Sequence, residues 1–97
     1  MSVQEIANIL NSFSRLLDFM NCHGHDETIQ NIEVDGTILI ITLQGHQGEV
    51  YDLEVWNSYT TGELCVENPI NHVSMFDFAE EYDMTENDVK YIRTGIR

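Results

Sequence analysis

Residues 29–43 read IQNIEVDGTILIITL, and this stretch decides the fold class. Asp35-Gly36 at its centre is a residue pair favoured in two-residue β-hairpin turns of the type that needs a positive φ at both positions. The turn predicts one strand at Ile29–Val34 and a second at Thr37–Leu43. The run Ile38-Leu39-Ile40-Ile41 is apolar on both faces of its strand. It therefore belongs in the centre of a sheet that is covered on each side.

Two further strands follow the hairpin. Residues Glu49–Trp56 alternate between an apolar face, with Tyr51, Leu53 and Val55, and an acidic face, with Asp52 and Glu54. This period of two is typical of a strand with one buried face and one exposed face. A short fourth strand is predicted at Glu63–Glu67, and Asn68-Pro69 ends it. The short turns between these segments indicate a four-stranded antiparallel sheet.

A long helix precedes the sheet. Its apolar residues recur at three- and four-residue spacing, as in one stripe of an amphipathic helix: Val3, Ile6, Leu10, Phe13, Leu17 and Met20. Ser2 and Glu5 have the S-x-x-E spacing of a capping box, and Gly24 is suited to end the helix. We expect this helix to cover one face of the sheet. The other face is left to the C-terminal helices or to a partner subunit.

Two short helices are predicted at the C-terminus. Ser74 opens the first, which runs to about Tyr82, and Thr85 caps the second with Asp88 three residues later. The chain of 97 residues is thus expected to be a single α+β domain spanning residues 1–97. Its architecture is an N-terminal helix, a four-stranded antiparallel sheet and a C-terminal two-helix hairpin.

The chain is strongly acidic, with 17 Asp and Glu against 4 Lys and Arg and a formal net charge of −13. Its apolar content of 42% is too high for a disordered acidic tail, so the acids must be displayed on a folded body. The densest group lies within twelve residues and contains Asp77, Glu80, Glu81, Asp83, Glu86 and Asp88. Such a surface repels nucleic acid and attracts proteins that bind nucleic acid.

Added salt is expected to stabilise the fold, because the carboxylates repel one another in the folded state. At about 0.15 M ionic strength the Debye length is roughly 8 Å, which weakens repulsion between all but the nearest charges. The melting temperature should therefore rise between low and moderate NaCl concentrations. A melting temperature that falls over this range would contradict the prediction.

The segment FAEEYDMTENDVKYI (residues 78–92) resembles a helix-turn-helix of the DNA-binding type. The resemblance rests on Ala79 where the helices would cross, Asp83 at the turn, and the apolar residues Met84, Val89 and Ile92. It implies a recognition helix that begins with Glu86, Asn87 and Asp88. Carboxylates at these positions oppose binding to phosphates, which relies on Lys and Arg. We therefore expect no direct contact with nucleic acid.

In size and charge the chain is similar to small acidic phage proteins that mimic DNA and inhibit restriction enzymes, uracil-DNA glycosylase or CRISPR effectors. This likeness implies a non-enzymatic inhibitor that occupies the basic groove of a nucleic-acid-binding protein in the host cytoplasm. The predicted partner-binding residues are Asp77, Glu80, Glu81, Asp83, Glu86 and Asp88, with Asp52 and Glu54 in addition. The alternative is a regulatory or adaptor domain that binds a protein through a degenerate helix-turn-helix, and a homodimer also stays open.

The best metal candidate is Cys22-His23-Gly24-His25-Asp26, whose side chains include three types of zinc ligand. Its spacing is tighter than that of structural zinc sites, and a polar helix end explains the same residues, so no metal or other cofactor is expected.

The sequence has no G-x-S-x-G, HExxH or phosphate-binding glycine loop, which argues against an enzyme. It has no apparent signal peptide, and no apolar run approaches the ~18 residues of a membrane span. A cytoplasmic protein with reduced cysteines is the expectation.

Overall fold

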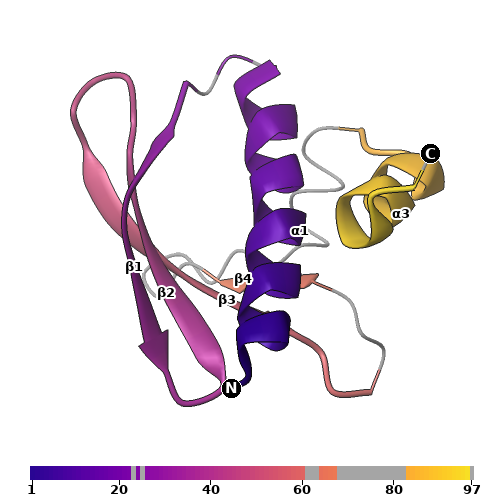
Figure 1. Cartoon of the computed structure of the whole chain (residues 1–97). Helices are drawn as coiled ribbons and strands as arrows, with labels where there is room; N and C mark the ends of the chain where they lie inside the picture. Colours follow the sequence, from indigo (N-terminus) through magenta and orange to yellow (C-terminus); the bar gives the residue numbers. More distant parts are fainter. Residues whose placement is uncertain (23, 25, 61–63, 68–82, 97) are drawn as a thin grey trace.

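Four antiparallel strands form one sheet in the order β1-β2-β3-β4, and a long helix packs across it (Figure 1). The computed structural model describes residues 1–22, 24, 26–60, 64–67 and 83–96. The elements are α1 (Val3–Cys22), β1 (Thr28–Asp35), β2 (Ile38–Gln44), β3 (Val50–Asn57), β4 (Leu64–Glu67) and α3 (Glu86–Thr94). The α+β class, the N-terminal helix and the four-stranded antiparallel sheet are confirmed. The helix predicted at residues 74–82 lies outside the described residues.

Helix α1 begins and ends where its capping residues indicate. The Ser2 Oγ accepts a hydrogen bond from the backbone N–H of Glu5 at 3.1 Å, which satisfies one of the unpaired donors of the first turn. Gly24 follows the last turn with a φ of 94°, a conformation that glycine adopts without strain. The Asn21 side chain then bonds both backbone groups of Glu27, at 3.0 and 2.8 Å. These bonds fix the direction in which the chain enters β1.

The β1–β2 hairpin forms as the sequence predicts, but its turn lies one residue later. Asp35 still pairs with Ile38 across the turn, so the two loop residues are Gly36 and Thr37. Gly36 has a φ of 63°, whereas Asp35 keeps a negative φ because it belongs to the strand. A glycine at the first of two loop positions is itself a favoured hairpin arrangement. The predicted strand bounds therefore shift by one residue on each side of the turn.

The core lies between α1 and the sheet. Phe13 and Leu16 of α1 are completely buried, and they pack with the inward-facing residues of strands β2, β3 and β4. Those strand residues are Leu39, Ile41, Leu43, Leu53, Val55, Leu64 and Val66. Removing such side chains from water is the main favourable contribution to folding, at roughly 25 cal/mol per Å² of apolar surface. The core therefore covers one face of the sheet, and the opposite face is the one that α1 leaves open.

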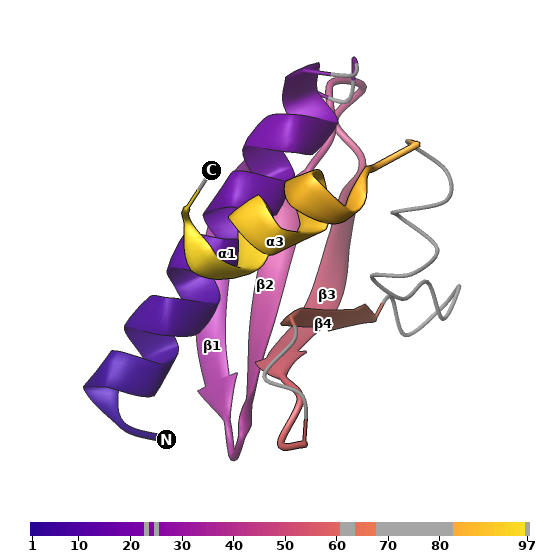
Figure 2. The same cartoon turned by 90° about the vertical axis from the view of Figure 1, so that its right-hand side faces the viewer.

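Helix α3 lies across α1 on the side away from the sheet (Figures 1 and 2). The predicted cap is confirmed, because Thr85 Oγ1 accepts from the Asp88 backbone N–H at 3.1 Å and Asp88 Oδ2 accepts from the Thr85 N–H at 3.0 Å. Ile92 joins the core and is 2% exposed. Since α3 packs on α1, it does not provide the second cover expected for β2. No element of the described chain covers the far face of the sheet.

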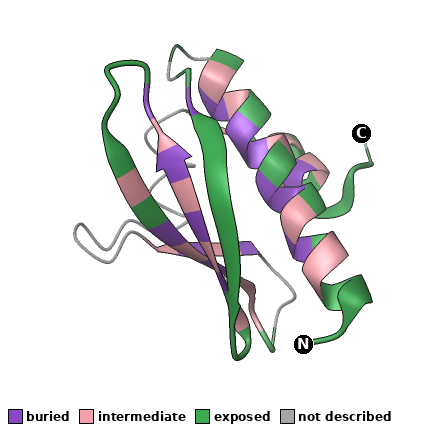
Figure 3. Ribbon diagram, turned by 60° about the vertical axis from the view of Figure 1, so that its left-hand side comes forward, coloured by how far each residue is buried: buried purple, intermediate pink, exposed green. Residues whose placement is uncertain are grey.

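Strand β1 is an edge strand whose eight residues are all exposed (Figure 3). Its Ile32 and Val34 lie on the α1 side of the sheet, opposite Ile41 and Leu39 of β2, yet they are 40% and 53% exposed. The backbone groups along the outer side of this strand have no neighbouring strand in the described structure.

Among the described helices, none is long and apolar enough to cross a membrane.

Candidate acidic partner-binding face

The sheet surface that points away from α1 carries a regular pattern of acids. We call it the outer face and define it by ten residues that alternate with the inward-facing ones. These are Glu33 and Asp35 of β1, Ile38, Ile40 and Thr42 of β2, Asp52, Glu54 and Trp56 of β3, and Cys65 and Glu67 of β4. Five of the ten are carboxylates. The pattern arises because inward-facing apolar residues alternate along the strands with outward-facing residues, half of which are acidic.

Four of the five acids of the outer face form two rows with an uncharged strip between them, and the fifth, Glu67, lies on β4 beside the second row. Glu33 and Asp35 lie on β1, while Asp52 and Glu54 lie on β3. Strand β2 separates them and contributes only uncharged side chains to this face. Neighbouring strands are about 4.8 Å apart, so the two rows are about 10 Å apart, and residues two apart along a strand are about 6.5–7 Å apart. The strand register thus sets the spacing of the charges in both directions.

One line of residues runs across all four strands. Glu33 is opposite Ile40, Ile40 is opposite Glu54, and Glu54 is opposite Glu67. Like charges directly opposite one another on adjacent strands destabilise a sheet. The Glu54–Glu67 contact, taken by itself, is therefore unfavourable.

Asp52 is held in place by its neighbour on β2. The Thr42 hydroxyl donates a hydrogen bond to Asp52 Oδ1 at 2.6 Å, between residues that are also paired in the strand register. A carboxylate fixed in this way loses less conformational freedom when a partner binds. Glu54 is half-buried between its two strand neighbours, whereas Asp52 is exposed. Both acids predicted on this strand therefore lie on the open face, one beside the other.

The acids predicted in the C-terminal segment have different positions. Asp77, Glu80 and Glu81 lie outside the described residues. Asp83 is exposed and takes the turn position with a φ of 52°, and Glu86 is exposed in the first turn of α3. Asp88 is half-buried, and its Oδ2 accepts hydrogen bonds from the Thr85 backbone N–H and hydroxyl. Asp88 therefore serves the helix cap, which explains its place in the sequence without a partner protein.

The described acids of the predicted site fall into two separate groups. Asp52 and Glu54 lie on the outer face of the sheet, and Asp83 and Glu86 lie at the start of α3. Because α1 lies between the sheet and α3, the two groups are on opposite sides of the molecule (Figure 1). One flat partner surface cannot contact both. The outer face is the better candidate, because its carboxylates lie on paired strands in a fixed register.

Three acids of the outer face were not predicted as site residues. Glu33 and Asp35 belong to it because β1 pairs with β2 in a register that places both residues on the same face as Ile38 and Ile40. Glu67 joins it through its pairing with Glu54. The alternation of apolar and polar residues along β4 is the signal for that placement, but four residues are too few to show a period reliably.

The metal candidate at the end of α1 gains no support from the geometry. Cys22 and Asp26 are exposed, and His23 and His25 lie outside the described residues. Within the described ranges, no three His, Cys, Asp or Glu side chains are grouped so as to hold a metal ion. Cys22 is the last residue of α1, and Gly24 and Asp26 lie in the connection to β1.

The described apolar residues of the segment that resembles a helix-turn-helix pack toward the core. Met84 and Ile92 pack on the buried cluster between α1 and the sheet. Val89 is half-buried on the same helix, and Ala79 lies outside the described residues. The apolar residues that carry the resemblance thus have a packing role in α3 and the turn before it.

The chain was also compared with protein-family models, with curated proteins and with solved structures. None of the three comparisons finds a match. The arrangement of the side chains is therefore the basis for a functional proposal.

Proposed function

We propose that this protein is a non-enzymatic inhibitor that mimics DNA through the outer face of its sheet. The observation that carries the proposal is the pair of acidic rows on β1 and β3 with the uncharged strip of β2 between them. A nucleic-acid duplex has the same general pattern, in which two rows of negative charge border a groove. The outer face would occupy the basic cleft of a nucleic-acid-binding protein and keep it from loading its substrate.

The spacing along each row supports this proposal. Successive phosphates on one strand of a duplex are about 6–7 Å apart, given an axial rise of about 3.4 Å and the path of the backbone. Glu33 and Asp35, like Asp52 and Glu54, are two residues apart on a strand and therefore about 6.5–7 Å apart. Lys and Arg side chains that contact consecutive phosphates would meet carboxylates at similar distances.

The net charge supports the proposal in a second way. A protein of net charge −13 is drawn to a positively charged cleft over a longer range than direct contact. Such attraction raises the rate of association with a basic partner and opposes association with acidic ones. In the strip between the rows, Ile38 and Ile40 are half-buried and offer an apolar contact area once a partner has docked.

Capture experiments test the proposed function directly. The immobilised protein is expected to retain nucleic-acid-binding proteins from a cell lysate, and an excess of duplex DNA should release them. Binding should also weaken steeply as NaCl increases, because the contacts are between opposite charges near the surface. The adaptor alternative predicts retained proteins that neither DNA nor moderate salt releases, and that result would overturn the mimic proposal.

A further inference from the structure

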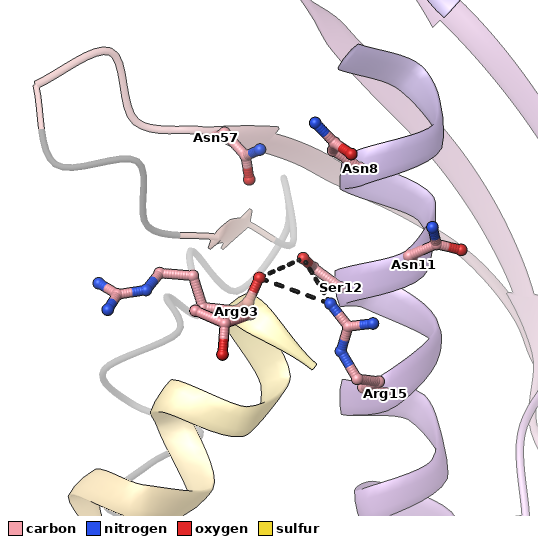
Figure 4. Close-up of a pocket in the computed structure, with 7 residues that line it drawn as sticks. Asn8, Asn11, Ser12, Arg15, Asn57 and Arg93 are labelled. Atoms are coloured by element: carbon pink, nitrogen blue, oxygen red, sulfur yellow. Dashed lines mark hydrogen bonds between the residues drawn. The ribbon is translucent and has the colours of Figure 1, made fainter. Parts of the chain in front are cut away.

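A polar pocket lies where α1, the end of β3 and the C-terminus of α3 meet (Figure 4). Its volume is about 280 Å³. The lining contains three carboxamides, from Asn8, Asn11 and Asn57, two hydroxyls and two arginines. No acidic residue is among the described residues that line it, although the chain carries 17 acids. Both hydroxyls already donate to backbone carbonyls, Ser12 Oγ to Arg93 and Thr94 Oγ1 to Lys90, so the donors left for a ligand are those of the carboxamides and the arginines.

Arg15 is the fixed positive charge of this pocket. Its Nε donates to the Ile92 carbonyl at 2.9 Å, and its Nη2 donates to Ser12 Oγ at 3.4 Å and to the Arg93 carbonyl at 3.5 Å. These bonds hold the guanidinium against the end of α3, where Gly95 leaves room for Nη1. The Arg93 side chain, in contrast, points away from α1 (Figure 4). The positive charge of the pocket therefore comes mainly from Arg15.

The Nη1 group of Arg15 retains binding capacity. An arginine has five N–H donors, of which the bonds above use the one on Nε and those on Nη2. Within the described part of the chain, the two N–H groups of Nη1 donate to no acceptor. A half-buried guanidinium with donors to spare can still donate charge-assisted hydrogen bonds through Nη1 to an oxygen of a carboxylate or phosphate group. Carboxamide NH₂ groups on the pocket wall add further donors.

We propose that this pocket binds a small oxyanion, namely a carboxylate or phosphate group of a small molecule. The pocket is lined by residues of α1, of α3 and of the last position of β3 (Figure 4), and none of the ten residues of the outer face lines it. The proposal is therefore independent of the DNA-mimic function. The protein would then have two sites, an outer face that binds positively charged groups and a pocket that binds negatively charged ones.

NMR titration tests the proposal with inorganic phosphate and with acetate, added separately at constant ionic strength with NaCl as the reference salt. At least one of the two anions should cause saturable shifts in the Arg15 Nε–H signal and in the backbone signals of Ser12 and Thr94. The anion that saturates at the lower concentration identifies the preferred group. If neither anion produces saturable shifts beyond those of chloride, the pocket is not an oxyanion site.

A change in Asn11 distinguishes binding in the pocket from binding elsewhere. Arg15 also holds α3 on α1, so its replacement would disturb the fold, whereas the exposed Asn11 makes no side-chain hydrogen bond within the described residues. Asn11→Asp places a negative charge in the pocket and should weaken anion binding about tenfold or more. Gln47→Glu, in the exposed β2–β3 turn, adds the same charge elsewhere and should leave the affinity nearly unchanged. Equal affinity of the Asn11→Asp variant and the original protein would overturn the proposal.

Discussion

Replacing Phe13 with alanine is expected to lower the free energy of unfolding by about 3–5 kcal/mol. The Phe13 side chain is completely buried between α1 and the sheet, and alanine would leave a cavity that the surrounding side chains cannot fill. A domain of this size is typically stable by about 5–15 kcal/mol, so the variant loses a large share of its stability. Urea unfolding followed by circular dichroism measures the change.

Val3 on the same helix provides the control for Phe13. Its side chain is 84% exposed, so Val3→Ala should change the free energy of unfolding by no more than about 0.5 kcal/mol. Alanine has the higher helix propensity in both substitutions, so that effect has the same sign in the two variants. The difference between their changes in the free energy of unfolding therefore reports the burial of Phe13 against the sheet. A loss below about 1 kcal/mol for Phe13→Ala would contradict the packing of α1 on the sheet.

The double replacement Asp52→Lys with Glu54→Lys is expected to weaken partner binding by about 100-fold or more. Close charge pairs at protein interfaces contribute about 1.5–7 kcal/mol of coupling each, and reversal turns attraction into repulsion. The fold should tolerate the change. The lysine introduced by Glu54→Lys would lie opposite Glu67 and relieve the repulsion of the original pair, which offsets the loss of the Thr42–Asp52 hydrogen bond. Affinity for the captured partner and the melting temperature are the two measurements.

A charge-matched variant shows whether position or total charge matters. Asp18→Lys with Glu86→Lys changes the net charge by the same amount, and both residues are exposed on the helices. If the outer face is the binding site, this variant should lose much less affinity than the sheet variant. If the helix variant loses affinity and the sheet variant does not, the site belongs to the helical side and the outer-face proposal is wrong.

The sequence predicts the fold well because its local signals agree with each other. The glycine-containing turn after Asp35, the alternation around Leu53 and the stripe through Phe13 each indicate the element that forms. Thr85 and Asp88 form the expected capping box. Most strand ends differ by one residue from the prediction, because the last paired residue of a strand depends on the loop geometry, as in the Asp35–Ile38 pair.

The candidate site was harder to predict, because it depends on contacts between elements. The alternation in β3 shows that Asp52 and Glu54 share a face, but only the pairing of β1 with β2 places Glu33 there too. The position of α3 also has no local signal. Apolar residues such as Ile92 indicate that the helix packs on something, while the choice of α1 over the open face of the sheet depends on tertiary contacts.

The open edge of β1 gives the high charge a second consequence, which concerns contacts between copies of the protein. An exposed edge strand with apolar residues such as Ile32 and Val34 is a template for strand pairing with another molecule. Electrostatic repulsion between copies opposes that pairing. Glu33 and Asp35 lie on the edge strand itself, so their carboxylates contribute directly to this repulsion. The salt that relieves repulsion within each folded molecule also lets two edges approach. Conditions that favour the fold are therefore also those that favour aggregation.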